Sequence, residues 1–432
     1  MMEIGYLPEF LLDISPCPIH ILLPNQFKIL VDKLVANSGI GKIFKPRLYT
    51  YSDFIIPKVY AIICNKSLHR ACEQLNTLCW RHIVKEKKRK ILIYQDNKRK
   101  RRLIPHQTDV DRFFRRLSMQ EIKYIFGGVL DFIVIRILDL HAKRRTWKLI
   151  ADNTKDPFYG ELDPKYHVKY PGLPGTKYAW FCQGLSILSK DIHLYVDFHE
   201  IQKGVYRSLH IPGTVEWLNW IGISPSSLIV DREFYRATLV NDMRKRQVPI
   251  LMPTKKYKWV RHRMEMYLLG KGHWISGTIF FQSFKQYPNQ TSVFVRCVLI
   301  GHNERGAWEV KNDYDKGVIS FDEAMSQLSG FFTTMKPWKN EKSWARYLIR
   351  EYKKRWNIET GFSKMNEWHV RFRSRKYNSY FAVKYINAWL YNLWQGNLLE
   401  NKRDSVLFRD TTLEDYRDAL SSDLVNKILA QI

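Results

Sequence analysis

Apolar and polar residues follow a helical period in the first third of the chain and a strand period after Arg145. Apolar residues recur at helical spacing from Thr50 to Cys64 and again after Ser67, and the polar pair Asn65–Lys66 separates the two stretches. Ser67 suits the start of a helix because its hydroxyl can accept a backbone N–H. The pattern predicts two helices joined by a short turn, as in a helix-turn-helix.

Short apolar runs bounded by polar turns follow Arg145 and predict strands. The first three predict an antiparallel meander: TWKLIAD, which ends in Asp152, then KYAWFCQGLSIL and IHLYVDF. A helix, a strand ending in Asp231, a helix and a strand come next, in GTVEWLNWIG, SSLIVD, RATLVNDMRKRQ and VPILMP. Strands that alternate with helices predict an α/β domain, in which ligands bind at strand ends.

The pattern changes twice more toward the C-terminus. Between Thr254 and Asn340, the strand-like segments TIFFQSF and SVFVRCVLIGH predict a β-rich insertion. From Ser343 to Trp368 no Gly or Pro occurs before Gly361, so one long helix is predicted there.

Three carboxylates stand out in this pattern. Glu359 shares one face of the long helix with Tyr352 and Arg355, since the three lie at i, i+3 and i+7. Asp152 and Asp231 can meet Glu359 if their strands are neighbours. Clustered carboxylates repel each other, and divalent cations relieve the repulsion. Two Mg²⁺ ions about 3.5–4 Å apart suit an in-line phosphodiester displacement. Mg²⁺ prefers oxygen ligands, and the sequence shows no His or Cys cluster.

Other interpretations of the acidic residues stay open. Arg355 and Glu359 can form a solvated i, i+4 ion pair on an amphipathic helix with no role in a site. Glu351 is the alternative to Glu359 as third ligand. Asp156 fits a turn residue better than a ligand, and Glu233 fits a charge at the start of a helix.

The chain carries 70 Lys and Arg against 42 Asp and Glu, a net charge of +28. Such an excess indicates a polyanionic partner, nucleic acid before an anionic membrane. The charge is densest in a run that encloses a short apolar patch, which predicts a basic hairpin or wing: Lys85, Lys87, Lys88, Arg89, Lys90, Lys98, Arg99, Lys100, Arg101 and Arg102.

A third predicted helix follows this basic run. It begins between Gln107 and Asp109 and carries Arg112, Arg115 and Arg116. We therefore expect residues 50 to 118 to dock on DNA, with Lys and Arg on phosphates and Gln107 aimed at base edges. The alternatives are a solvated basic surface or, in a eukaryote, a nuclear-import signal.

The sequence also argues against several classes of protein. No apolar run reaches the roughly 18 residues of a spanning helix, and Asp131 and Arg136 interrupt the best candidate, Tyr124 to Leu138. Glu3 and the lack of a basic stretch before the first apolar residues argue against a signal peptide. We therefore expect an intracellular protein, cytoplasmic and associated with the nucleoid. No nucleotide-binding glycine motif occurs, so no nucleotide cofactor is expected.

Cysteine and histidine spacing adds no further site. The six cysteines form no C-x-x-C pair, and reduced thiols are predicted rather than a structural zinc site. Cys64, Cys72 and Cys79 are predicted to share one helix face. The lone histidines with no partner spacing are predicted to have surface or core roles: His167, His199 and His369.

Three segments resemble the D-D-E transposases of prokaryotic insertion sequences. KLIADNTKDPFYG is similar to the first-Asp strand of that family, LIVDREFY to its D-R-x-F/Y motif, and YKKRWNIETGF to its Y-x-x-R-x-x-x-E helix. Together they span Arg145 to Trp368, about half of the chain. The resemblance is strongest to the cut-and-paste group that has a β-rich insertion before the Glu.

The resemblance implies an RNase H-like mixed-sheet catalytic core. It implies metal ligands at Asp152, Asp231 and Glu359 for two Mg²⁺ ions, with Mn²⁺ as a substitute. It also implies DNA-backbone contacts at Tyr352 and Arg355.

One position departs from the family. The helix of the family often carries a Lys seven residues after the Glu, where this chain has Asn366. Lys364 is the expected substitute for that contact with the terminal phosphate.

The implied activity is metal-dependent cleavage at inverted terminal repeats, followed by transfer of the freed 3′-OH into double-stranded target DNA. Both ends must be held together, so a homodimer on DNA is expected. Trp259, Trp274 and Trp338 can stack on a flipped base, as the insertion of this family does, or can belong to the core. The alternatives are a DNA nuclease on the same core without strand transfer, and a non-catalytic DNA-binding derivative.

The expected organisation has five parts. An N-terminal helical DNA-binding region with the basic run covers residues 1–140, and the first part of the RNase H-like core covers 141–253. The β-rich insertion covers 254–341, the C-terminal part of the core 342–400, and a tail 401–432.

Overall fold

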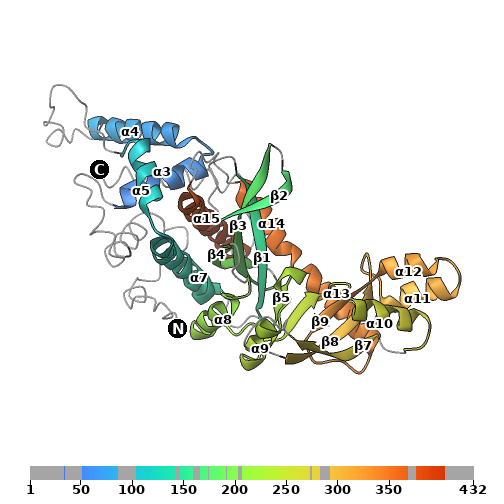
Figure 1. Ribbon diagram of the computed structural model, residues 1–432. Coiled ribbons are helices and arrows are strands. Elements are labelled where there is room, and N and C mark those ends of the chain that lie inside the picture. Colours follow the sequence, from blue (N-terminus) through green and yellow to red (C-terminus); the bar gives the residue numbers. More distant parts are fainter. Residues whose placement is uncertain are drawn as a thin grey trace.

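The described strands form one mixed nine-stranded sheet that runs along the molecule (Figure 1). The computed structural model describes residues 34, 51–85, 104–141, 146–158, 166–173, 175–190, 192–202, 207–272, 275–282, 292–367 and 376–403. Neighbouring strands follow the order β2-β3-β1-β5-β6-β9-β8-β7, and β4 pairs with β3 outside this path. Their bounds are β1 Lys148–Pro157, β2 His167–Leu173, β3 Thr176–Leu188, β4 His193–Glu200, β5 Leu228–Val230, β6 Ile250–Pro253, β7 Ser276–Gln282, β8 Ser292–Gly301 and β9 Leu328–Thr333.

Helices pack along the sheet and at both ends of it. Helices α3, α4 and α5 lie at one end of the molecule, and α10, α11 and α12 lie at the other (Figure 1). A mixed α/β fold is thus confirmed. The helices are α3 Tyr51–Ile63, α4 Leu68–Lys85, α5 Gln107–Arg116, α6 Met119–Ile122, α7 Gly128–His141, α8 Ile211–Trp220, α9 Ala237–Lys245, α10 Lys258–Leu268, α11 Ala307–Asp315, α12 Phe321–Gln327, α13 Glu341–Lys353, α14 Trp356–Glu367 and α15 Tyr377–Arg403, with a π-helical turn η4 at Lys123–Gly127 and a 3₁₀ turn η5 at Arg232–Phe234.

The helices at the N-terminal end form where the sequence predicts them. Asn65 in the turn between α3 and α4 has a φ of 48°, a left-handed conformation that Asn adopts more readily than most residues. The Ser67 hydroxyl accepts the backbone N–H of Arg70 at 3.3 Å and so caps α4. Helix α5 begins at Gln107, as expected. The two helices, their turn and the start of the third are therefore confirmed, and a role on DNA stays a prediction.

The predicted antiparallel meander is β1, β3 and β4. Strands β1 and β3 pair along their whole length, from Lys148↔Leu188 to Pro157↔Ala179, and β3 pairs antiparallel with β4. Strand β2, which the sequence pattern did not predict, pairs with the beginning of β3. Strands β5 and β6 add to the other edge of β1 in parallel.

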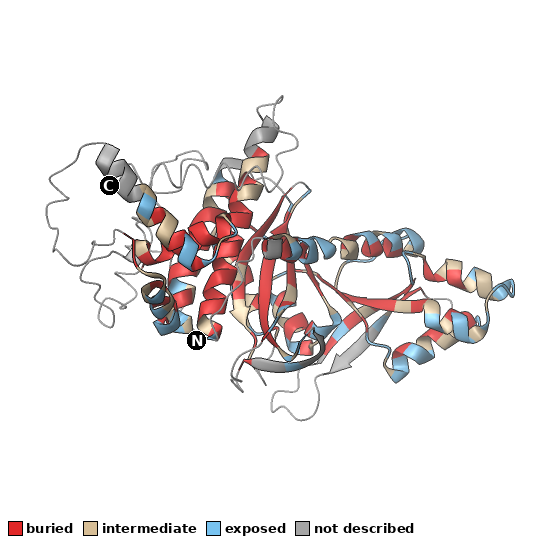
Figure 2. Ribbon diagram, turned by 90° about the horizontal axis from the view of Figure 1, so that it is seen from above, coloured by how far each residue is buried: buried red, intermediate tan, exposed pale blue. Residues whose placement is uncertain are grey.

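The segment from residue 254 to 341 extends the same sheet. Strand β9 pairs antiparallel with β6, and β8 and β7 follow it. The two predicted strands are β7 and β8. The expectation of a β-rich insertion left out three helices, α10, α11 and α12. These helices bury narrow apolar faces, such as Ala307 and Val310 of α11, and much of their surface is exposed (Figure 2).

Helix α15 packs against β4 and α7 and is buried along most of its length (Figure 2). The side-chain amide of Asn392 accepts the backbone N–H of Tyr195 at 2.9 Å and donates to the Tyr195 carbonyl at 2.7 Å. The Trp389 indole N–H donates to the Phe126 carbonyl at 2.9 Å. These buried hydrogen bonds fix the register of α15 against the edge strand β4, because a shift by one residue would leave them unpaired.

The long helix predicted from Ser343 to Trp368 is instead two helices, α13 and α14. At the break, the backbone N–H of Arg355 bonds to the Tyr352 carbonyl at 2.9 Å, which is a three-residue rather than a four-residue step. The Asn357 amide donates to the Lys354 carbonyl at 2.8 Å and so competes with the helical pattern. The prediction of one helix was wrong because neither Gly nor Pro marks this break.

His193 on β4 is a buried histidine next to α15. Its Nδ1 lies 2.9 Å from the Tyr391 hydroxyl, and its Nε2 has no hydrogen-bond partner in the described part of the chain. Burial lowers the pKa of His193 from 6.5 to about 3. The folded protein therefore keeps the imidazole neutral at pH values where the unfolded chain protonates it.

We predict that His193 makes the protein sensitive to mild acid. Its contribution to stability is fully present above pH 6.5 and is lost as the pH falls toward 3, since only the unfolded chain takes up the proton. Between pH 7 and pH 5.5, the wild type should lose about 1 kcal/mol more unfolding free energy than His193→Gln, measured by urea unfolding. The control His262→Gln, at a side chain 71% exposed on α10, should keep the wild-type pH dependence. Equal pH dependence in the wild type and His193→Gln would contradict the prediction.

Candidate functional site

Asp152 and Asp231 lie next to each other where two parallel strands part. Ala151 of β1 pairs with Val230 of β5, and this is the last of three parallel pairs. Each Asp directly follows that pair. Strand β5 ends there, and the Asp231 carboxylate accepts the backbone N–H of Arg232 at 2.7 Å to start the turn η5. The register therefore brings together two carboxylates that are far apart in sequence.

The prediction that a strand ends in Asp152 was wrong for β1. Strand β1 continues to Pro157 because β3 pairs with it over its full length. What ends at Ala151 is the parallel pairing with β5. The side of β1 that faces β5 is thus left open from Asp152 onward.

Arg355 ties Asp152 to Glu359. Its Nη1 lies 2.6 Å from Asp152 Oδ2, and its Nη2 lies 2.7 Å from Glu359 Oε1. The Arg355 and Asp152 side chains are only 12% and 13% exposed, so solvent screens this pair weakly, whereas Glu359 is half-exposed. The i, i+4 pair of Arg355 and Glu359, which could have been a solvated contact, is one half of a bridge between the helix and the sheet.

The charges of this cluster act on one another. The pKa of Asp152 is raised to about 6, first by burial and also by the negative charges of Glu359 and Asp231, against the opposing effect of Arg355. Burial lowers the pKa of Arg355, but nearby Tyr352 and the three carboxylates outweigh burial and raise it above the usual value. Burial is therefore the main cause of the raised pKa of Asp152, and the neighbouring charges act on this pKa in both directions.

Two glycines let α14 approach the sheet. A Cβ on Gly361 would lie 2.6 Å from the Tyr195 hydroxyl, and a Cβ on Gly184 would lie 2.7 Å from the Phe362 ring. The Tyr195 hydroxyl also donates to the Ile358 carbonyl at 3.0 Å. The helix that carries the third carboxylate is therefore fixed against β3 and β4, and Gly184 is the β3 residue that pairs with Asp152.

Arg207 is a cation of this site that sequence reasoning missed. Burial lowers its pKa, while the charges of Asp231 and Asp152 raise it. It forms an ion pair with Glu233, whose carboxylate also accepts the Asn153 side-chain N–H at 3.2 Å. Glu233 does stand in the first turn of η5, as the sequence indicated. A single Arg between β4 and α8 carries no motif, so no sequence signal selected Arg207.

The two other carboxylates considered from the sequence are each paired with lysines. Glu351 is 4% exposed and forms ion pairs with Lys148 and, at 2.7 Å, with Lys354. Asp156 lies 2.7 Å from the buried Lys384 of α15. Asp156 is inside β1 rather than in a turn, so that expectation was wrong. Both carboxylates join β1 to helices.

The other residues that the sequence predicted to contact DNA lie on α10, α13 and α14 or beside them. The Tyr352 ring lies 5.5 Å from the Arg355 guanidinium, and burial is the largest cause that raises the Tyr352 pKa above its usual value. Lys364 is half-buried on α14. Trp259 and Trp338 are 38% and 47% exposed, and Trp259 stacks on Phe332 with ring centroids 5.5 Å apart. Trp274 and the side chain of Asn366 lie outside the described residues.

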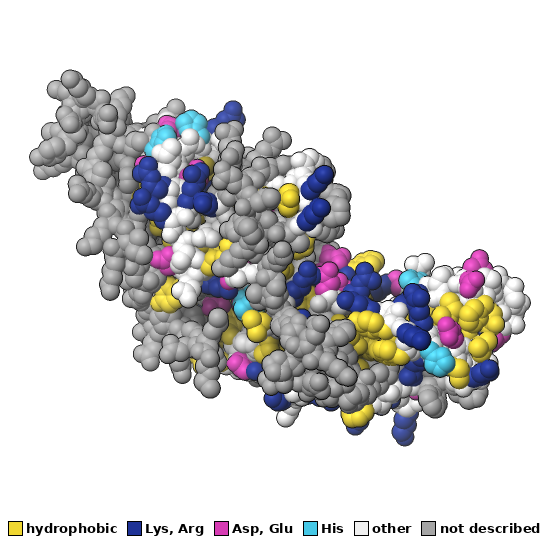
Figure 3. Space-filling view, in the orientation of Figure 1, with side chains coloured by type: hydrophobic (Ala, Val, Ile, Leu, Met, Phe, Trp, Pro, Cys, Tyr) yellow, Lys and Arg dark blue, Asp and Glu magenta, His cyan; other side chains and the backbone are white. Residues whose placement is uncertain are grey.

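The predicted DNA-docking residues are described only in part. The basic run from Lys87 to Arg102 lies outside the described residues. On α5, Gln107 is half-buried and the three arginines are exposed: Arg112, Arg115 and Arg116. Lys and Arg side chains gather over α5 and again in the middle of this face, near α13 (Figure 3). The exposed arginines are thus available to a polyanion, and DNA contact stays a prediction.

Metal-ligand spacing gives a result that the sequence did not anticipate. Within the described residues, one group of three His, Cys, Asp or Glu side chains has its ligand atoms all within 4.8 Å of one another, and it is His69, Glu73 and His106. The three carboxylates of the transposase-like motifs do not form such a group in this arrangement, in which the Arg355 guanidinium contacts two of them.

The cysteines and the other histidines form no further group of three metal ligands within the described residues. In the described part of the chain Cys64, Cys72, Cys182 and Cys297 take part in no disulfide. Cys64 follows α3 whereas Cys72 is in α4, so the predicted single helix face was wrong. His199 lies 2.8 Å from Asp197. The side chain of His167, and all of His369, Cys17 and the Cys79 side chain, fall outside what is described. No described helix is long and apolar enough to cross a membrane.

Comparison with known proteins finds seven matching chains among solved structures. No family model matches the sequence, and no curated protein matches it. The chain is similar to piggyBac transposase, solved by cryo-EM as a synaptic complex with hairpin DNA, with a TM-score of 0.48 and 9% sequence identity. The match covers 96% of this chain and 80% of that one. At this identity and score the likeness carries no conclusion about activity, and the function has to be argued from the residues.

We predict that Arg355 is required for stability when divalent cations are absent. Arg355→Gln removes the counter-charge of a carboxylate that stays buried, which should cost roughly 3 kcal/mol of unfolding free energy at pH 8. The cost should shrink at pH 5, because Asp152, with its pKa further raised, can then take up a proton. Urea unfolding in EDTA at both pH values measures this.

Arg350→Gln is the matched control, because Arg350 is exposed on α13. It should change the unfolding free energy by less than about 0.5 kcal/mol. If Arg355→Gln is as stable as this control at pH 8, the bridge has no structural role.

Proposed function

We propose that this chain is a D-D-E transposase of the prokaryotic insertion-sequence type, with an RNase H-like core. It binds the inverted terminal repeats of its own element, cleaves DNA there, and joins the freed 3′-OH to double-stranded target DNA. The observation that carries the proposal is the adjacency of Asp152 and Asp231 after the last parallel pair of β1 and β5, with Glu359 tied to Asp152 through Arg355. These are the three carboxylates of the transposase-like motifs.

The donor set and its electrostatics fit divalent metal ions. Asp152, Asp231 and Glu359 offer only carboxylate oxygens, which suit Mg²⁺, with Mn²⁺ as a substitute. The raised pKa of Asp152 reflects its burial first and also the negative charges of Glu359 and Asp231, which Arg355 opposes. Two ions held by these residues would supply activation of the attacking oxygen and stabilisation of the leaving oxygen.

The other residues of the site act on the DNA backbone in this proposal. The planar guanidinium of Arg355 presents donors in a fork that matches a phosphate, and the Tyr352 hydroxyl offers one more donor beside it. Lys364 on α14 replaces the Lys that the family often has at the position of Asn366. Arg112, Arg115 and Arg116, together with the basic run, bind phosphates of the terminal repeats.

A nuclease on the same core would share this site and differ in its products. Strand transfer requires two ends in one complex, so a homodimer on DNA is part of the proposal. A paired-end assay with labelled terminal repeats and a plasmid target separates the two activities, since only a transposase yields joined products. Cleaved ends without joined products would favour the nuclease, and neither product would favour a DNA-binding derivative.

We predict that Asp231→Asn eliminates Mg²⁺-dependent cleavage and leaves DNA binding intact. The substitution keeps the size and the hydrogen-bonding oxygen of the side chain and removes its charge. Cleavage should fall by more than the roughly 10–100-fold that loss of an outer partner of a metal ligand costs. Gel assays of end cleavage and filter binding of the same repeat DNA measure the two effects.

Asp322→Asn, at an exposed position on α12, is the control and should cleave like the wild type. Wild-type cleavage by Asp231→Asn would refute the assignment of the ligands. Loss of cleavage in both variants would show that the assay reports something other than this carboxylate.

We predict that the arginines of α5 contact DNA phosphates. Each neutralised phosphate steepens the dependence of log K on log salt concentration by roughly 0.9. Replacing the three arginines by Gln should therefore lower the slope by roughly 2 to 3. The same charge removed at exposed lysines at the other end of the molecule should leave the slope unchanged: Lys316, Lys336 and Lys339. An unchanged slope in the α5 variant would show that this helix does not contact DNA phosphates.

A further inference from the structure

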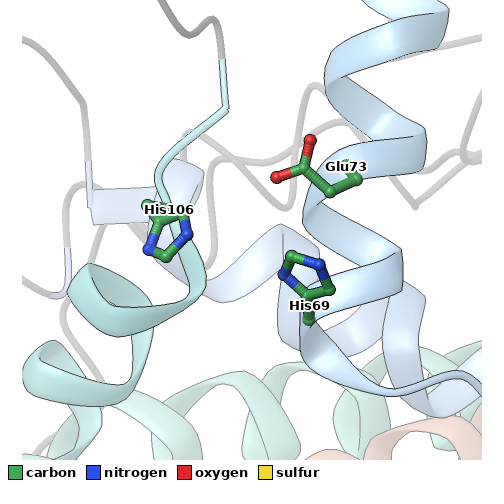
Figure 4. Close-up of side chains that lie close together, drawn as sticks. All are labelled: His69, Glu73 and His106. Carbon is green, nitrogen blue, oxygen red and sulfur yellow. The ribbon is translucent and has the colours of Figure 1, made fainter.

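A second cluster of possible metal ligands lies at the helical end of the molecule, apart from the carboxylates of the sheet. His69 and Glu73 are four residues apart on α4, so they share one face, and His106 comes from the segment that enters α5 (Figure 4). The Glu73 carboxylate points from α4 toward His106 (Figure 4). One ligand atom from each of the three residues lies within 4.8 Å of the others.

We propose that His69, Glu73 and His106 bind one divalent transition-metal ion, with Zn²⁺ as the cation that fits best. Two imidazole nitrogens and one carboxylate oxygen are a common ligand set for zinc, whereas Mg²⁺ and Ca²⁺ take oxygen ligands. His69 is exposed, and Glu73 and His106 are half-buried, so the ion can enter from solvent and water can complete its coordination.

Contacts with Thr108 orient the His106 ring. Its Nδ1 lies 2.9 Å from the Thr108 hydroxyl oxygen and accepts the Thr108 backbone N–H at 3.3 Å. Because Nδ1 is engaged by Thr108, Nε2 is the nitrogen left for the ion. Binding of a metal at Nε2 places the ring proton on Nδ1, which then donates to the Thr108 hydroxyl, as is usual around a ligating histidine, and no longer accepts the Thr108 backbone N–H.

His69 and Glu73 line a surface pocket with Gln74 and Thr77. The Lys66 ammonium at the edge of this pocket donates to the Gln74 side chain at 2.5 Å. The His69 and His106 rings meet edge to face, with centroids 6.4 Å apart.

The consequence for the fold is a cross-link between α4 and α5. These helices flank the segment that holds most of the basic run. A hydrogen bond of 3.4 Å joins the backbone N–H of Ile104, ahead of α5, to the Asn76 side chain of α4. A bound ion would fix the spacing of α4 and α5, because ligands from both helices must meet at one point. The two ends of the basic segment would then be held in place.

Isothermal titration of the full-length, EDTA-treated protein with ZnCl₂ tests the proposal. We expect one site per chain with an affinity that His106→Asn weakens at least tenfold. Asn is chosen because it is among the best residues at the start of a helix, so the cap of α5 is kept while the metal ligand is lost. Glu73→Gln, which keeps the shape of the side chain, should weaken Zn²⁺ binding to a similar degree, and MgCl₂ should give no signal that these substitutions change.

The matched control is His262→Gln, which removes another surface histidine that has a Glu one turn away on its own helix, Glu265. It should bind Zn²⁺ like the wild type. Thermal unfolding gives an independent readout: Zn²⁺ should raise the Tm of the wild type and of His262→Gln and leave that of His106→Asn unchanged. Zn²⁺ affinity and Tm shift that are the same in the wild type, His106→Asn and Glu73→Gln would overturn the site. Equal weakening by His262→Gln would do the same, because it would indicate scattered surface binding.

Discussion

The structure around the candidate site depends on how a buried negative charge is compensated. Asp152 sits within the sheet at a position where burial and two neighbouring carboxylates oppose its ionisation. Arg355 is the group that contacts it directly, and the same guanidinium reaches the carboxylate on α14. One cation thus sets where the helix lies against the strand. Breaking such a pair on one side leaves an uncompensated charge, which costs far more than the pair itself contributes.

The rest of the core is arranged so that this bridge can form. The parallel register of β1 and β5 stops at Ala151 and Val230, which leaves both acidic residues at an open edge. The helical path breaks at Lys354, so that α13 and α14 are separate and Arg355 sits at their junction. Gly184 and Gly361 remove the two Cβ atoms that would hold α14 away from the sheet. The strand register, the helix break and the close packing of α14 thus all help to position the residues of the bridge.

Local pattern predicted most of the helices and strands, while long-range geometry set the details that the pattern missed. The strands and the N-terminal helices follow from periodicity and from caps such as Ser67. The helix break does not follow from periodicity, because it depends on tertiary contacts of Arg355 and on an Asn side chain that competes for a carbonyl. The length of β1 follows from pairing with a strand that comes later in the chain.

The residues that carry no motif were the ones missed. Arg207 faces the two aspartates from a loop, and only folding brings it there. His69 and His106 are far apart in sequence and show none of the close spacing by which zinc ligands are usually found. Glu73 lies one turn from His69, but a Glu beside a His on an exposed helix is common. Spatial proximity across two helices is the information that one sequence does not contain.

Either the Arg355 guanidinium or bound metal ions can neutralise the carboxylate cluster, and this choice affects how such a site works. Two nitrogens of the Arg355 guanidinium, Nη1 and Nη2, contact Asp152 and Glu359 in this structure. Under the proposed function these carboxylates bind cations and Arg355 binds a DNA phosphate, so the present bridge has to open. Opening it without a replacement cation leaves Asp152 buried and uncompensated, which is unfavourable. Release of Arg355 toward DNA and neutralisation of the carboxylates by metal are therefore coupled, since each removes the cost of the other.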